Sequence, residues 1–85
     1  MAHVVELSKR AQRELRKLSS DLQVRIMSCL EALAENPRPP GAEKLAGEEN
    51  AYRVRIGAYR ILYEVRDVVL VVIVMRIGHR RDVYR

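Results

Sequence analysis

Hydrophobic and polar residues alternate with a period of two along residues 51–66, which is the spacing of side chains on a β-strand. Gly57 interrupts the alternation and indicates a turn between two strands. One face is apolar and comprises Tyr52, Val54, Ile56, Tyr59, Ile61, Tyr63 and Val65. The opposite face comprises Arg53, Arg55, Arg60, Leu62, Glu64 and Arg66. The pattern therefore predicts two strands that carry arginine side chains on a single face.

The segment before this pair has apolar residues three and four positions apart, as is typical of amphipathic helices. We expect a short strand at His3–Leu7, followed by a first helix with Ser8 as its N-cap. Ser20 and Gln23 fit a capping box for a second helix, which should end at residues 36–37. The inward-facing positions are Leu7, Ala11, Leu15 and Leu18, and then Leu22, Ile26, Cys29, Leu30 and Leu33.

A Pro/Gly-rich loop is expected between the second helix and the strand pair. After a turn at residues 66–67, residues 68–77 are apolar at odd and even positions alike, which predicts an interior strand covered on both faces. Gly78 would permit a turn after it. The order β-α-α-β-β-β predicts a single α+β domain over residues 1–85. Its two N-terminal helices should pack on the apolar face of a small, mainly antiparallel sheet and leave the arginines exposed.

Length and composition exclude several classes of protein. Eighty-five residues make one domain, and a hydrophobic content of 48% suits a packed core rather than a disordered chain. The longest apolar run, Val68 to Met75, is shorter than the roughly 18 residues that a membrane helix needs. The N-terminus lacks the layout of a signal peptide, and a single cysteine, Cys29, cannot form an internal disulfide, so we expect a cytoplasmic protein. No zinc-type spacing or Gly-rich phosphate loop occurs, so we expect no metal or cofactor.

The positive charge is confined to one part of the chain. Residues 1–50 carry eight basic and eight acidic side chains, whereas residues 51–85 carry eight basic and three acidic ones and hold the whole net charge of +5. All eight of these basic residues are arginine, whose planar guanidinium binds phosphate in a bidentate way. The segregated charge predicts a polyanionic partner, with a basic surface kept for solubility as the alternative.

The C-terminal segment adds groups that suit phosphodiester chemistry. His79, Arg80, Arg81 and Tyr84 follow the last strand, and we expect them to overhang the basic face. Arginine stabilises charge on phosphate oxygens, and an acid and a base can move protons during attack by an RNA 2′-hydroxyl. No carboxylate cluster suggests Mg²⁺, so metal-free attack is the simplest expectation. His79 is the only histidine of this cluster, and histidine is the side chain that most often serves as an acid or base at neutral pH.

Two stretches, "YRVRIGAYRILYEV" at residues 52–65 and "VLVVIVMRIGHRRDVY" at residues 69–84, resemble the RelE family of toxins, within the RelE/ParE superfamily. The resemblance covers nearly the whole chain and implies a RelE-like fold. It implies a toxin of a type II toxin–antitoxin system that cleaves mRNA in the ribosomal decoding site. It also implies a cognate antitoxin that wraps the toxin and supplies most of the binding to operator DNA.

The resemblance also assigns roles to individual residues. Arg53 and Arg55 match the family's basic pair that binds the RNA backbone, with Arg81 beside them. The catalytic positions that it implies are Arg60, Arg80 and Tyr84, with Tyr84 stacking on a base or transferring a proton, and the chemistry of the cluster adds His79 to them. The best-known members carry lysine where this chain has Arg53 and Arg55, and arginine is not deprotonated in proteins. The general base therefore remains open, with His79 as the leading candidate.

Two further functions stay open at this point. One is a ParE-like protein that inhibits DNA gyrase without cutting RNA, and the other is a relative that binds RNA without cleaving it. We also expect the antitoxin to place an amphipathic or acidic segment on the basic face, with helix-in-groove contacts along the two helices.

Overall fold

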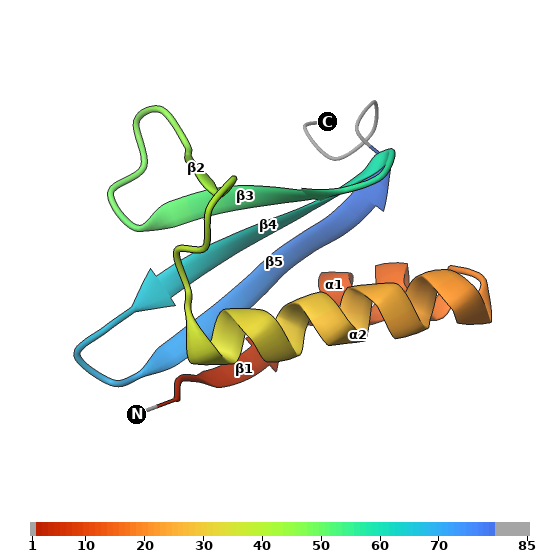
Figure 1. The fold of residues 1–85 in the computed structure, drawn as a ribbon, viewed down its shortest axis with the longest axis horizontal. Coiled ribbons are helices and arrows are strands. Elements are labelled where there is room, and N and C mark those ends of the chain that lie inside the picture. The colour runs from red at the N-terminus through yellow and green to blue at the C-terminus, as the bar shows by residue number, and fades with distance from the viewer. Residues whose placement is uncertain (1, 80–85) are drawn as a thin grey trace.

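The structure is a computed structural model that describes residues 2–79 (Figure 1). Its elements are β1 (Val4–Leu7), α1 (Lys9–Arg16), α2 (Ser20–Glu35), β2 (Glu43–Lys44), β3 (Ala51–Ile56), β4 (Tyr59–Arg66) and β5 (Val71–His79). This order confirms the predicted α+β arrangement and adds β2, a two-residue strand inside the expected loop. Neither helix of the described chain is long and apolar enough to cross a membrane.

The five strands form one sheet in the order β1-β5-β4-β3-β2. The β1–β5 pair is parallel, and the other three pairs are antiparallel. The two helices connect β1 to the rest of the sheet and lie together along one of its faces (Figure 1). The prediction of a mainly antiparallel sheet with both helices on one face is therefore confirmed.

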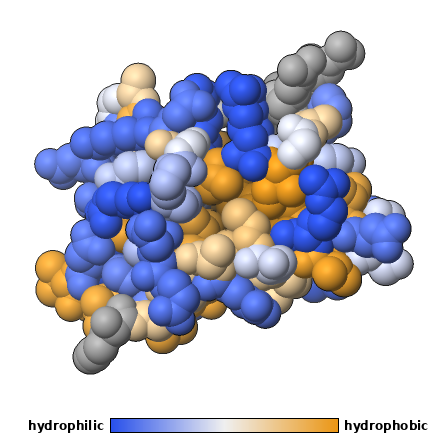
Figure 2. Space-filling view, in the orientation of Figure 1, coloured by the Kyte–Doolittle hydropathy of each residue, from blue (hydrophilic) through white to orange (hydrophobic). Residues whose placement is uncertain are grey.

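The core lies between the helices and the face of the sheet that the alternation marks as apolar. Its fully buried side chains are Ala11, Ile26, Leu30 and Leu33 from the helices and Ile61, Tyr63, Val65, Val72, Val74 and Ile77 from β4 and β5. Hydrophobic residues also gather between the strands and α2 in the space-filling view (Figure 2). Each large apolar side chain buried in this way contributes about 1.5–3 kcal/mol, so this single layer supplies most of the stability.

A β-bulge in β5 changes which residues face the core. Tyr63 of β4 pairs with Val74, but Leu62 pairs with Arg76, so Met75 is an extra residue in β5. An extra residue shifts the alternation of side chains by one position. The buried positions accordingly change from even to odd numbers, ending at Ile77. The bulge explains part of the long apolar run. Buried residues of β5 alternate with apolar residues that are only half-buried, such as Ile73 and Met75.

The strand β1 ends before its neighbour β5 does, and side chains of α1 and its N-cap form hydrogen bonds with the rest of the β5 backbone. Ser8 is the N-cap as predicted, and its Oγ accepts from the Ala11 N–H at 3.0 Å. The same hydroxyl donates to the Met75 carbonyl at 3.0 Å, and a carboxylate oxygen of Glu14 accepts from the Ile77 N–H at 2.9 Å. These two side chains satisfy backbone groups that β1 is too short to reach.

Three local predictions require correction. The N-cap of α2 is Ser19 rather than Ser20, and its Oγ accepts from the Leu22 N–H at 3.3 Å. Residues 66 and 71 form the last pair of the β4–β5 hairpin, and residues 67–70 form the turn between them. The strand β5 therefore starts three residues later than predicted, and Val68 in the turn is 99% exposed. Gly78 makes no turn, because it pairs with Arg60 inside β5.

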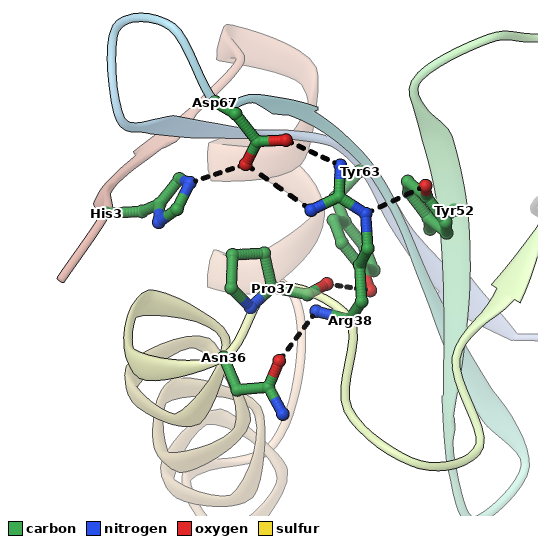
Figure 3. Close-up of polar contacts among 7 residues, drawn as sticks. All are labelled: His3, Asn36, Pro37, Arg38, Tyr52, Tyr63 and Asp67. Carbon is green, nitrogen blue, oxygen red and sulfur yellow. Dashed lines mark hydrogen bonds and ion pairs between the residues drawn. The ribbon is translucent and has the colours of Figure 1, made fainter. Parts of the chain in front are cut away.

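A polar network anchors the loop that follows α2 (Figure 3). The Arg38 guanidinium donates to the carboxylate of Asp67, at 2.8 and 3.3 Å, and to the Tyr52 hydroxyl at 2.9 Å. His3 Nε2 lies 3.1 Å from the same carboxylate. In this way Asp67 joins the start of β1, the loop and the turn between β4 and β5.

Beside this network, the buried Tyr63 hydroxyl donates to the Pro37 carbonyl at 2.7 Å (Figure 3). Burial raises the pKa of Tyr63 to about 12, so the donor proton is retained at every physiological pH. We predict that Tyr63→Phe lowers the free energy of unfolding by roughly 1–3 kcal/mol, because the Pro37 carbonyl then loses its partner. Urea denaturation measures this change. Tyr59→Phe is the control, since its hydroxyl makes no hydrogen bond within the described chain, and an equal loss there would contradict the prediction.

Asp67 makes stability depend on pH. The hydrogen bond from Arg38, followed by that from His3, lowers the pKa of the Asp67 carboxyl below its usual range. A lowered folded-state pKa adds stability above the unfolded pKa, and this stability is lost as the pH falls through the folded value. Asp67→Asn should therefore lower Tm at about pH 6, and the difference from the wild type should shrink as the pH falls through the folded-state pKa and the wild-type carboxyl becomes neutral as well. Glu48→Gln, at an exposed loop carboxylate, should leave Tm unchanged; a pH-independent loss in Asp67→Asn would argue against this linkage.

Candidate functional site

Arg53 and Arg55 of β3 and Arg60 of β4 lie on the face of the sheet opposite the helices. In the β3–β4 register Arg55 is directly across from Arg60, and Arg53 is across from Leu62. Side chains at paired positions point to the same side of a sheet, and the residues between them are the buried or half-buried ones that pack on the core. We call this group of three residues the arginine face. The structure therefore brings together the three strand arginines that the alternation predicts.

A carboxylate from β2 lies within the arginine face. Glu43 is paired with Arg53 across the β2–β3 register. Its Oε2 lies 2.7 Å from Nη2 of Arg53, and its Oε1 lies 3.9 Å from Nη2 of Arg55. The hydrogen bond from Arg53, and then the charges of Arg53, Arg55 and Arg60, lower the pKa of Glu43 below its usual range. Three guanidinium groups therefore surround one ionised carboxylate.

Sequence reasoning did not identify Glu43 as part of the site. The residue lies in a Pro/Gly-rich loop, and a strand of two residues has too few positions to show an alternating pattern. Its contact with the arginines follows from the pairing of β2 with the edge of β3. No signal in the local sequence indicates that pairing.

The arginine face retains positive charge and access to solvent. Glu43 contributes one negative charge against the three positive charges of the arginines, and the side chain of Arg55 is 60% exposed. Leu62 of β4 pairs with Arg53 on one side and with Arg76 on the other. Its side chain is only 8% exposed, so an apolar residue lies beneath the guanidinium groups. Arg76 itself is paired with Glu14 of α1 at 3.1 Å. Closely spaced, accessible guanidinium groups of this kind suit consecutive phosphates of a nucleic acid.

His79 lies on the other side of the sheet, which contradicts the expectation that it overhangs the arginine face. It pairs with Tyr59, and the two rings meet edge to face with centroids 5.7 Å apart. The position on the arginine face belongs to Gly78, opposite Arg60. The cause is the bulge at Met75, because without this extra residue the alternation would turn His79 toward the arginines.

The remaining predicted site residues are Arg80, Arg81 and Tyr84, which lie outside the described residues. Their assignment as catalytic or RNA-binding groups stays a prediction. Within residues 2–79, no group of three or more His, Cys, Asp or Glu side chains is placed to hold a metal ion.

Comparisons with known proteins identify the family of the chain and agree with its fold. The profile of the family described as ParE toxin of type II toxin–antitoxin system, parDE, matches residues 5–84. The mRNA interferase toxin RelE of Escherichia coli is 34% identical over 94% of this chain and 85% of its own length. The crystal structure of the isolated E. coli RelE toxin has a TM-score of 0.82 at 31% identity and covers 92% of this chain and 84% of its own. The toxin in the intact E. coli RelBE toxin–antitoxin complex has a TM-score of 0.82 at 31% identity, over 92% of this chain and 96% of its own.

Proposed function

Since the chain belongs to the RelE/ParE family of toxins of type II toxin–antitoxin systems, we propose that it is an endoribonuclease that cleaves mRNA in the decoding site of the ribosome. The observation that carries this proposal is the arginine face. Three guanidinium groups gather on the side of the sheet that no helix of the described chain covers, and together they offer a binding site for an anion. The relative named an mRNA interferase supports RNA as the polyanion.

In the proposed reaction the RNA supplies its own nucleophile. Arg53 and Arg55, with Arg81, hold the backbone phosphates on either side of the cleaved bond. Arg60 and Arg80 stabilise the charge that develops on the phosphate oxygens as the 2′-oxygen attacks and the 5′-oxygen leaves, which is worth about 3 kcal/mol for one well-placed donor. Tyr84 stacks on a base or transfers a proton. The reaction then needs no metal ion.

The proposed partners are the ribosome with its mRNA and a cognate antitoxin protein in the cytoplasm. Solved relatives are described as toxin–antitoxin complexes, which supports the antitoxin. Operator DNA would be bound only through that complex. A second candidate function, inhibition of DNA gyrase, is favoured by the description of the matching family profile as ParE toxin.

Mapping of mRNA ends tests the proposed cleavage. Translating ribosomes incubated with the protein should give new mRNA ends within the codon in the decoding site, and Arg60→Ala or Arg80→Ala should abolish them. Arg10→Ala is the matched control, because it removes the same charge from the exposed surface of α1. Intact mRNA together with gyrase-linked DNA damage would favour the second candidate, and an active Arg60→Ala variant would contradict the assigned site.

The salt dependence of RNA binding tests the electrostatic part separately. Each phosphate contact to a single strand contributes a slope of about −0.7 in log K against log salt, so three to five contacts predict roughly −2 to −3.5. Fluorescence anisotropy with a labelled single-stranded RNA measures the slope. A slope near zero would exclude phosphate binding by the arginine face, whereas tight, salt-dependent binding without any cleavage would indicate an RNA-binding relative.

A further inference from the structure

Glu43 places a carboxylate against two of the guanidinium groups of the arginine face. Its two carboxylate oxygens lie against Nη2 of Arg53 and Nη2 of Arg55. The Nη2 atom of each guanidinium is one of the donors that arginine uses to bind a phosphate. Since both anions use the same side of the same donors, a bound phosphate and the Glu43 carboxylate exclude one another there.

We propose that Glu43 is an internal counter-anion, which fills the phosphate position of the arginine face in the free protein and swings out when RNA binds. This inference rests on the proposed RNA-binding function and adds a residue that controls which ligands bind. The effect is selectivity for a polyanion. A single small anion replaces one carboxylate and gains little, whereas an RNA strand brings several phosphates and releases counterions from each.

The geometry allows the exchange without unfolding. The side chain of Glu43 is 48% exposed, so its carboxylate can rotate into solvent while the incoming phosphates of RNA replace it against the arginines. The backbone of β2 meanwhile stays hydrogen-bonded to β3, because that pairing uses main-chain groups.

Two further properties make Glu43 a constant competitor. Its lowered pKa keeps the carboxylate ionised throughout the neutral range, so the competition does not depend on pH near neutrality. The second property is that Glu43 reduces the repulsion among the positive charges of Arg53, Arg55 and Arg60 in the free protein.

The test compares Glu43→Gln with Glu48→Gln. Both variants remove one negative charge and lie in the segment around β2, but Glu48 has no ion pair with an arginine in the described chain. In anisotropy titrations with a labelled oligouridylate at low salt, Glu43→Gln should bind roughly three- to tenfold more tightly than Glu48→Gln. The difference should shrink as salt is added, because the interaction is screened.

A measurement without RNA separates this inference from the proposed function. Without its counter-anion the arginine face should lower the Tm of Glu43→Gln at low salt, and inorganic sulfate should restore it, while Glu48→Gln should respond like the wild type. Equal RNA affinities of the two variants, or weaker binding by Glu43→Gln, would overturn the role of Glu43 and leave RNA binding intact. If the wild type binds no RNA, the proposed function fails and this inference fails with it, even where the sulfate effect is seen.

Discussion

The two helices bury their apolar side chains against the face of the sheet that carries Ile61 and Tyr63, and no helix of the described chain covers the opposite face. This one-sided packing determines where every other group lies. Alternation along β3 and β4 places arginine on the side away from the core, where long charged side chains remain hydrated. The layer that stabilises the fold thus creates the surface that we assign to RNA.

The edge of β5 shows how closely the helices and the sheet depend on each other. β5 is longer than its parallel neighbour β1, so part of its edge needs other hydrogen-bond partners. Ser8 and Glu14 provide them from the start and the middle of α1. Ser8 thereby serves both as the cap of a helix and as the partner of the bulged residue Met75. The bulge in turn decides that His79 leaves the arginine face, so a single extra residue changes the chemistry available there.

The charges of the arginine face are arranged differently from those elsewhere in the molecule. Among the described residues, Arg66 pairs with Glu64 and Arg76 with Glu14, whereas Glu43 interacts electrostatically with Arg53, Arg55 and Arg60 together. The half-exposed Glu43 carboxylate partly neutralises these arginines but does not block the access of solvent to them. The chain belongs to a family of toxins with a relative named as an mRNA interferase, and it is on this basis that we assign the positive charge to RNA binding.

The sequence by itself determined the helices, β3 and β4, and the set of arginines that share a face, because these depend on periodic patterns and on caps such as Ser8 within a few residues. Only the tertiary structure decided the position of Glu43, the bulge at Met75 and the side on which His79 lies. Those features depend on the pairing of strands that are far apart in the chain or too short to show a pattern. Backbone pairing between distant segments leaves no local signal in the residues that it brings together.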